Sequence, residues 1–218
     1  MSGTLNDTPS ANRLHIGFFG RRNSGKSSLI NAFTGHEVSI VSDIAGTTTD
    51  PVYKAMEIHG IGACVLIDTA GFDDIGELGL IRVEKTRLAA EKSDIAVLVF
   101  SDTDIEKELL WLKHFRDKNT PVVTVITKGD SMADTASFKE LVAEKTGTEP
   151  IVTSVVHKTG LKELKEALIR SMPEGYGGRS LTGGLVSKGD MVLLVMPQDI
   201  QAPAGRLILP QVQTIRDL

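Results

Sequence analysis

A glycine-rich loop between an apolar segment and a helical segment constrains the fold of this chain more than any other feature. Residues 20–27 read GRRNSGKS and fit the pattern G-x-x-x-x-G-K-[S/T]. The preceding run, Leu14–Gly20, predicts a buried strand, and Lys26–Gly35 predicts a helix with Gly35 as its C-terminal cap. The backbone N–H groups of such a loop, together with the positive end of the helix dipole, bind phosphate. The loop therefore predicts a nucleotide-binding α/β domain.

Strand and helix patterns alternate along residues 13–173. The predicted strands are Leu14–Gly20, Val52–Ile58, Ala63–Thr69, Ile95–Phe100, Pro121–Thr127 and Ile151–Ser154. The predicted helices are Lys26–Gly35, Leu78–Lys92, Asp104–Lys118, Phe138–Thr146 and Gly160–Met172. This order predicts parallel βαβ units in a sheet covered by helices on both faces, with the alternating segment Val52–Ile58 at an edge. Ligands of such sheets bind at the carboxyl ends of the strands, so motifs that carry chemistry should follow strands.

Phosphate and magnesium ligands are expected in the loop and after the third predicted strand. Lys26 is expected to bridge the β- and γ-phosphates, and the Ser27 hydroxyl to ligate Mg²⁺. Further nucleotide contacts are expected from Asn23, Ser24, Gly25 and Ser28. In the DTAG segment that ends the third strand, Asp68 is positioned to hold Mg²⁺ through water, and the Gly71 N–H to meet the γ-phosphate. An ordinary turn is the alternative for this short motif.

The threonine-rich segment AGTTTD, residues 45–50, lies between these two motifs. A threonine hydroxyl here completes the Mg²⁺ shell when the γ-phosphate is present, and we expect Thr48 rather than Thr47 to do so. The alternative is a solvated turn.

A base-reading loop is expected after the strand Pro121–Thr127. The Asp130 carboxylate can accept hydrogen bonds from guanine N1 and N2, and the Lys128 stem can pack on the base, so GTP is favoured over ATP. Thr127 stands where an asparagine usually braces this loop, so we expect weaker nucleotide binding. After the last strand, Ser154 and the Val155 N–H are expected near guanine O6, with an ordinary turn as the alternative.

The five motifs, in this order and spacing over residues 13–172, resemble a translation-factor-type GTPase domain. GRRNSGKSSLINAF, AGTTTDP and DTAGF are most similar to the branch that contains MnmE, Era and Der. The resemblance implies a P-loop NTPase fold, α/β, with a six-stranded, mostly parallel sheet and one antiparallel edge strand, which Val52–Ile58 matches. It also implies hydrolysis of GTP to GDP and phosphate with slow intrinsic turnover.

The resemblance further implies a potassium ion in the catalytic centre. In that branch a loop asparagine and the backbone of the first switch segment bind K⁺, and Asn23 stands at the matching position, which implies K⁺-stimulated hydrolysis. Alternatively, Asn23 only stabilises the loop turn. Phe72 occupies the place of the water-orienting glutamine of Ras-like proteins, so Glu77 is the candidate for that role by analogy. A solvated acid at a helix start is the alternative for Glu77.

The composition changes after Pro173. Residues 174–184 read EGYGGRSLTGG and predict a Gly-rich linker. Residues 185–218 predict a strand, a proline-interrupted loop and the start of a helix at Pro210. Because this pattern stops inside a predicted helix, we expect the sequence to be a piece of a longer protein, with a truncated second, dimerisation-like domain over residues 185–218.

Arg206–Leu218 resembles the start of the dimerisation domain of the HydF family, the FeFe-hydrogenase maturation GTPases. This implies a GTP-driven switch in assembly of a hydrogenase metallocofactor, a homodimer of the full-length protein, and contacts with other maturation enzymes and the hydrogenase. That family carries its iron–sulfur cluster on a Cys- and His-rich C-terminal domain. Cys64 is the only cysteine here, so no cluster is expected in this chain.

Two other functions stay open. One is a GTPase of tRNA modification or ribosome assembly, but an RNA-binding continuation should be basic or carry a KH-type GXXG, and neither occurs before Leu218. The net charge of −4 likewise argues against nucleic-acid binding. The other is a nucleotide-gated interaction module with negligible turnover.

The N-terminal residues indicate where the protein is found. Residues 1–12 are polar, predict disorder and lack the apolar core of a secretory signal. No apolar run approaches the roughly 18 residues of a membrane span. We therefore expect a cytoplasmic protein with no membrane partner.

Overall fold

The computed structural model describes residues 13–35, 38–44, 51–72, 77–132, 134–173 and 189–195, with the backbone alone for residues 38–44, 77 and 78. The chain divides into two units, residues 14–174 and residues 1–13 with 175–218. The strands are β1 (Leu14–Gly20), β2 (Val38–Ile44), β3 (Val52–Ile58), β4 (Gly62–Asp68), β5 (Ile95–Phe100), β6 (Val122–Ile126) and β7 (Ile151–Val152). The helices are α1 (Lys26–Thr34), α2 (Glu77–Glu91), α3 (Glu106–Asp117), α4 (Thr135–Thr146) and α5 (Leu161–Arg170).

The strands of the larger unit form one sheet in the order β2-β3-β4-β1-β5-β6-β7. β1 pairs in parallel with β4 and β5, and β6 pairs in parallel with β5 and β7. β3 is antiparallel to both of its neighbours, β2 and β4. The predicted fold class, an α/β fold with a mostly parallel sheet, is confirmed.

All six predicted strands are present, but the sheet has a seventh, β2, so β3 is not the edge strand that the sequence predicted. β2 reads VSIVSDI, with polar and apolar residues in partial alternation, and it pairs with β3 from Val38 opposite Ile58 to Ile44 opposite Tyr53. A register shift between Ile40 and Ser42 interrupts that pairing. The irregular alternation explains why the pattern escaped the sequence analysis.

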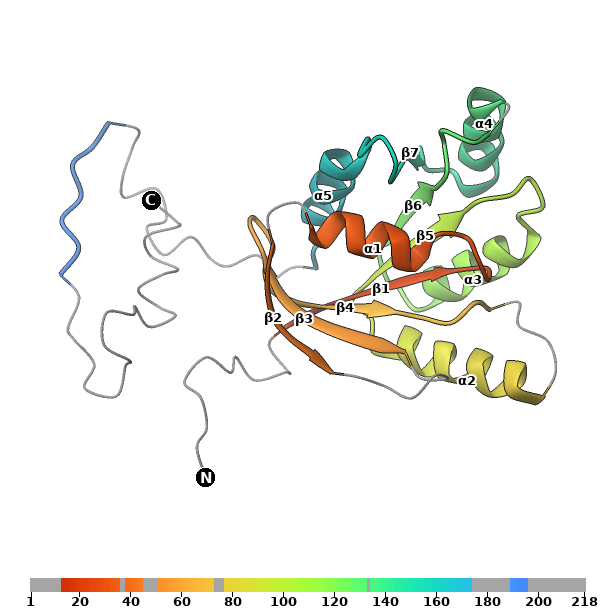
Figure 1. The fold of residues 1–218 in the computed structure, drawn as a ribbon, viewed down its shortest axis with the longest axis horizontal. Coiled ribbons are helices and arrows are strands. Elements are labelled where there is room, and N and C mark those ends of the chain that lie inside the picture. The colour runs from red at the N-terminus through yellow and green to blue at the C-terminus, as the bar shows by residue number, and fades with distance from the viewer. Residues whose placement is uncertain are drawn as a thin grey trace. The chain divides into compact units, whose positions relative to one another are not determined.

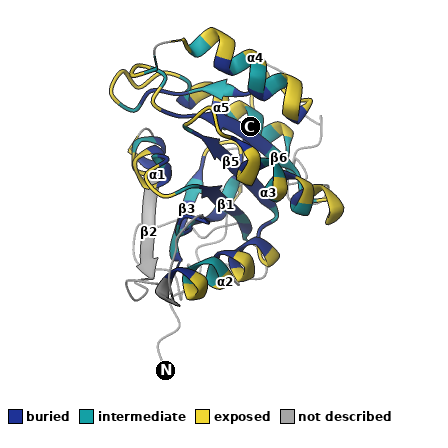
Figure 2. Ribbon diagram, turned by 90° about the vertical axis from the view of Figure 1, so that its right-hand side faces the viewer, coloured by how far each residue is buried: buried dark blue, intermediate teal, exposed yellow. Residues whose placement is uncertain are grey.

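Helices cover both faces of the sheet (Figure 1). One face carries an apolar cluster in which side chains of α2, α3 and α4, such as Ala90, Phe115 and Phe138, pack with Phe19 and Phe100 of the sheet. α1 packs against β1 and β4, and α5 packs against β6. Every residue of the inner strand β5 is buried, as expected for a parallel strand covered on both sides. Figure 2 shows the buried inner strands of the sheet and the exposed outer faces of the helices.

Helix ends differ from the prediction by a few residues. α4 starts at Thr135 rather than Phe138, because the Asp134 carboxylate accepts a hydrogen bond from the Ser137 N–H at 3.0 Å and so caps the helix. α3 starts at Glu106, two residues later than predicted. Gly35 ends α1 as predicted, although in a right-handed conformation. None of the described helices is long and apolar enough to cross a membrane.

Several predictions fall on other parts of the chain. The predicted disordered segment 1–12 and linker 174–184 lie outside the described residues. Of the predicted second domain, the structure describes residues 189–195, which expose Met191, Leu193 and Val195. Residues 191–195 have no regular secondary structure, and the predicted second domain stays a prediction.

Candidate functional site

The phosphate-binding loop connects β1 to α1 as the motif predicts. Asn23 and Gly25 have φ angles of 57° and 90°, so the loop turns through left-handed conformations that favour these residue types. A Cβ atom on Gly20 would lie 2.8 Å from the Val99 carbonyl oxygen, so only glycine fits there. The loop backbone therefore requires the residues that define the motif.

Lys26 lies inside this loop, with 6% of its surface exposed. Its Nζ atom donates hydrogen bonds to the carbonyl oxygens of Gly20 at 2.9 Å and Arg21 at 2.6 Å. The hydroxyl of Ser24, which is fully buried, lies 3.4 Å from the same atom. The ammonium group is thus held at the centre of the loop, where a phosphate would sit.

Asp68 and Ser27 meet at the carboxyl end of the sheet. Asp68 ends β4 and lies opposite Phe18 of β1, and its carboxylate accepts a hydrogen bond from the Ser27 side chain. Burial raises the pKa of Asp68, while the hydrogen bond from Ser27 and the charge of Lys26 oppose that rise. Within the described part of the chain, its Oδ1 atom is buried without a hydrogen-bond partner.

This pair fits a magnesium ion. Mg²⁺ prefers hard oxygen ligands, and a buried carboxylate oxygen without a partner, beside a hydroxyl group, offers that chemistry. Asp68 and Ser27 are the two residues that the sequence predicted for Mg²⁺.

The segment after Asp68 packs against the phosphate-binding loop. A Cβ atom on Gly71 would lie 2.4 Å from the backbone nitrogen of Arg22, so the Gly71 backbone touches the loop directly. The next residue, Phe72, is 7% exposed and stacks on Trp111 with ring centroids 5.6 Å apart. Phe72 therefore points into the core, and cannot orient a water as the corresponding glutamine does in Ras-like proteins.

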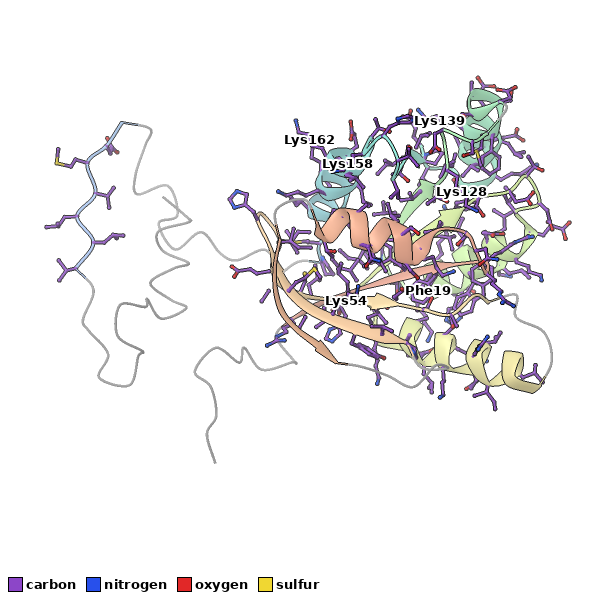
Figure 3. The ribbon with its side chains drawn as sticks, viewed as in Figure 1. Phe19, Lys54, Lys128, Lys139, Lys158 and Lys162 are labelled. Carbon is purple, nitrogen blue, oxygen red and sulfur yellow. The ribbon has the colours of Figure 1, made fainter. Side chains whose placement is uncertain are left out.

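The base-reading loop is tied to the phosphate-binding loop by two hydrogen bonds. The Thr127 hydroxyl, in a side chain that is 2% exposed, donates to the Ser24 carbonyl oxygen at 2.5 Å. The Lys128 ammonium donates to the Asn23 carbonyl oxygen at 2.7 Å, and Lys128 lies just beyond the end of β6 (Figure 3). Through its hydroxyl, Thr127 thus links the base-reading loop to the phosphate-binding loop. It does so at the position where the missing asparagine led us to expect weaker nucleotide binding.

Asp130 and Ser154 are brought together as the base-reading motifs require. The Ser154 hydroxyl donates to Oδ1 of Asp130 at 2.6 Å, and its oxygen accepts the His157 N–H at 3.1 Å. The bond from Ser154 is the main reason why the pKa of Asp130 lies below its usual value, so the group is charged at neutral pH. Val155 opens the turn that follows. A fixed, charged carboxylate at this place suits the two N–H donors of guanine.

Comparison with known protein families agrees with this geometry. A family model described as 50S ribosome-binding GTPase matches residues 15–128, more than half of the chain. The chain belongs to this GTPase family. A second family model, described as the hydrogen maturase F dimerization domain, matches residues 181–218.

Relatives of this GTPase lie in the branch that the motifs indicated. GTPase Der of Wolinella succinogenes is 43% identical over 109 residues, which cover 46% of this chain and 23% of the relative. The tRNA modification GTPase MnmE of Mannheimia succiniciproducens is 33% identical over 213 residues, which cover 91% of this chain and 45% of the relative. The chain thus spans less than half the length of these curated relatives.

Among solved structures, Era of Aquifex aeolicus bound to GDP·AlF₄⁻ is 27% identical to this GTPase. The TM-score is 0.60, and the match covers 74% of this chain and 57% of that chain. The similarity confirms the P-loop GTPase fold.

Some predicted site residues of the GTPase stay predictions. Thr47 and Thr48 lie outside the described residues, as does the side chain of Glu77, whose backbone begins α2. The left-handed conformation of Asn23 suits a turn-stabilising role and leaves the K⁺ role open. The sequence analysis missed one partner of the site, Glu108 of α3, which binds Arg21 of the loop.

We expect a Thr127→Val substitution to weaken GDP binding and to lower the free energy of unfolding by about 1–3 kcal/mol, because it leaves the Ser24 carbonyl oxygen without this donor. Denaturant unfolding and equilibrium binding of GDP measure the two effects. Thr124→Val is the matched control, since Thr124 is equally buried in β6 but bonds to Thr148. Equal GDP affinity in the two variants would show that the Thr127 hydroxyl does not brace the site.

Proposed function

We propose that this chain binds GTP with Mg²⁺ and hydrolyses it slowly as the switch domain of a larger protein. The observation that carries the proposal is the meeting, at one end of the sheet, of the Lys26 loop, the Asp68–Ser27 pair and the Asp130–Ser154 pair. Each group lies at the carboxyl end of a strand. The Lys26 loop suits the phosphates, the Asp68–Ser27 pair suits Mg²⁺, and the Asp130–Ser154 pair suits guanine.

The residues have separate tasks in this proposal. Lys26 exchanges its bonds to loop carbonyls for bonds to the β- and γ-phosphates, where its charge opposes the charge that develops during transfer. Ser27 and Asp68 would hold Mg²⁺, which when bound would neutralise charge on the phosphate oxygens. Gly71 offers its N–H to the γ-phosphate. Asp130 selects guanine.

Thr48 and Glu77 complete the proposed catalytic set. Thr48 would complete the Mg²⁺ ligands when GTP is bound, and Glu77 would orient the attacking water, by analogy with the MnmE branch. Phe72, at the position of the Ras-like glutamine, packs on Trp111 in the core. This supports assigning the orientation of the water to a residue other than Phe72.

We propose that K⁺ stimulates hydrolysis, with Asn23 as a ligand. We expect turnover in K⁺ to exceed turnover in Na⁺ by about tenfold or more, because a cation in the place of an arginine finger stabilises the same charge. Phosphate release at saturating GTP measures the effect, and Asn23→Ala should remove the difference. Equal turnover in the two salts would contradict the K⁺ site. Negligible turnover in both, with GTP bound, would favour an interaction module.

For the biological role, we propose maturation of a hydrogenase metallocofactor. The match of residues 181–218 to the hydrogen maturase F dimerization domain supports it. In this proposal residues 174–184 link the GTPase domain, residues 13–173, to the beginning of a dimerisation domain over residues 185–218. The full-length protein would be a cytoplasmic homodimer that contacts the other maturation enzymes and the hydrogenase.

The second candidate role is tRNA modification or ribosome assembly. It is favoured by the names of relatives such as MnmE, and by a similar solved structure of Era in complex with nucleotides 1506–1542 of 16S ribosomal RNA. Deleting the gene for the full-length protein separates the roles. Loss of hydrogenase activity with normal ribosomal subunits and tRNA modification supports maturation, and the reverse pattern supports the RNA role.

A further inference from the structure

The first side chain of the phosphate-binding loop is fixed by α3. The Arg21 Nε atom lies 3.0 and 3.2 Å from the two carboxylate oxygens of Glu108, and its Nη1 atom lies 3.0 Å from Oδ2 of Asp104. The exposed fractions differ sharply between the two acids, at 3% for the Glu108 side chain and 63% for Asp104. Glu108 is therefore the buried partner of Arg21, whereas Asp104 is a solvated one.

Because the Glu108 carboxylate is buried, the protein is destabilised if its ion pair with Arg21 is broken. A carboxylate taken out of water loses its hydration, and burial accordingly raises the pKa of Glu108 while Arg21 opposes the rise. A buried charge that loses its partner is strongly destabilising, whereas an exposed pair contributes little. Loss of Glu108 should therefore disturb Arg21 more than loss of the solvated Asp104, which bonds to the same guanidinium at 3.0 Å.

The backbone of Arg21 is hydrogen-bonded to the side chain of Lys26. The carbonyl oxygen of Arg21 accepts the shorter of the two loop bonds from Lys26 Nζ, at 2.6 Å. A chain of contacts therefore runs from Glu108 through the side chain and the backbone of Arg21 to the ammonium group of Lys26.

A second contact of α3 keeps the helix in place beside the site. Trp111 lies one turn after Glu108, so the two side chains share one side of the helix. Its ring stacks on Phe72 at 5.6 Å and on Phe19 at 5.8 Å. Phe72 directly follows Gly71, the glycine in contact with Arg22 of the loop. α3 thus contacts both segments that would surround the phosphates.

We propose that Glu108 is a positioning residue of the nucleotide site, acting through Arg21 on the phosphate-binding loop. The proposal rests on the GTPase function proposed above. Glu108 contacts the loop through the Arg21 side chain, and its carboxylate holds the backbone of Arg21 in place before GTP arrives. A preformed loop binds both GTP and GDP more tightly, because less conformational freedom is lost on binding.

The test replaces Glu108 by its neutral isostere in the Glu108→Gln variant. We expect the dissociation constants of GTP and GDP to rise about tenfold, with kcat at saturating GTP within about twofold of wild type, as loss of uniform binding predicts. Glu106→Gln is the matched control, since Glu106 lies exposed in the same turn of α3. A fluorescent GDP analogue and phosphate release measure the two quantities. Wild-type affinity in Glu108→Gln, or an equal loss in Glu106→Gln, would overturn the proposal.

A second variant keeps the test decisive if Glu108→Gln does not fold. Arg21→Lys retains the positive charge but loses the Nε donor and the planar guanidinium, so we expect a several-fold loss of GDP affinity below the unfolding temperature. Thermal unfolding without nucleotide measures the stability of the variant separately. A variant that loses stability but keeps wild-type GDP affinity would overturn the proposal. If the wild-type chain itself binds no GTP, the proposed function fails instead.

Discussion

The Lys26→Ala variant should lose GTP hydrolysis, with phosphate release at saturating GTP and Mg²⁺ reduced by at least about a hundredfold. The ammonium group is buried within the loop and held by two loop carbonyl oxygens, so its charge lies where the phosphates would bind. Removing it takes away the positive charge where negative charge grows in the transition state.

A matched control for this substitution is Lys139→Ala. Lys139 is half-exposed on α4 and pairs with Glu149 on the surface (Figure 3), so its loss should leave turnover and nucleotide binding unchanged. Retained hydrolysis in Lys26→Ala would remove the phosphate-binding loop from the mechanism and contradict the proposed function as a whole.

The Asp130→Asn variant should bind GTP about a hundredfold more weakly and gain affinity for xanthosine triphosphate. Xanthine carries a carbonyl group where guanine carries its amino group. The asparagine NH₂ can therefore donate to xanthine, whereas in guanine it would face another N–H donor. The new amide oxygen can still accept the Ser154 hydroxyl, which now bonds to Asp130 at 2.6 Å, so the loop should keep its shape.

Competition between the two nucleotides for a fluorescent GDP analogue measures this change. Asp134→Asn is the control, because Asp134 caps α4 four residues later and does not contact Ser154. Asparagine is also a good cap, so that variant should match wild type. Unchanged GTP affinity in Asp130→Asn would show that another group reads the base.

The features visible in the sequence are those encoded by neighbouring residues. The loop at Gly20–Ser27 requires glycines and a lysine at fixed spacing, and such a pattern implies the strand, the turn and the helix together. Asp68 and Asp130 could be placed because each follows an apolar strand. Their meeting then follows from the rule that parallel strands end at one edge of a sheet.

The features missed depend on how distant segments pack. Arg21 and Glu108 are 87 positions apart, and nothing in either local pattern shows that α3 passes beside the loop. The Thr127 hydroxyl bonds to the backbone carbonyl of Ser24, 103 positions away. Every residue has a backbone carbonyl, so the residue types do not reveal this hydrogen bond. β2 was missed because its alternation is irregular and its pairing is shifted between Ile40 and Ser42.

The two bonds from Thr127 and Lys128 to the phosphate-binding loop have a consequence for nucleotide release. Because the base-reading loop and the phosphate-binding loop are fastened to each other, base and phosphates are not held independently. A partner protein that displaces the base-reading loop also removes two supports of the phosphate-binding loop. Exchange of GDP for GTP could then be accelerated from the base side, by a factor that never reaches the phosphates or the metal.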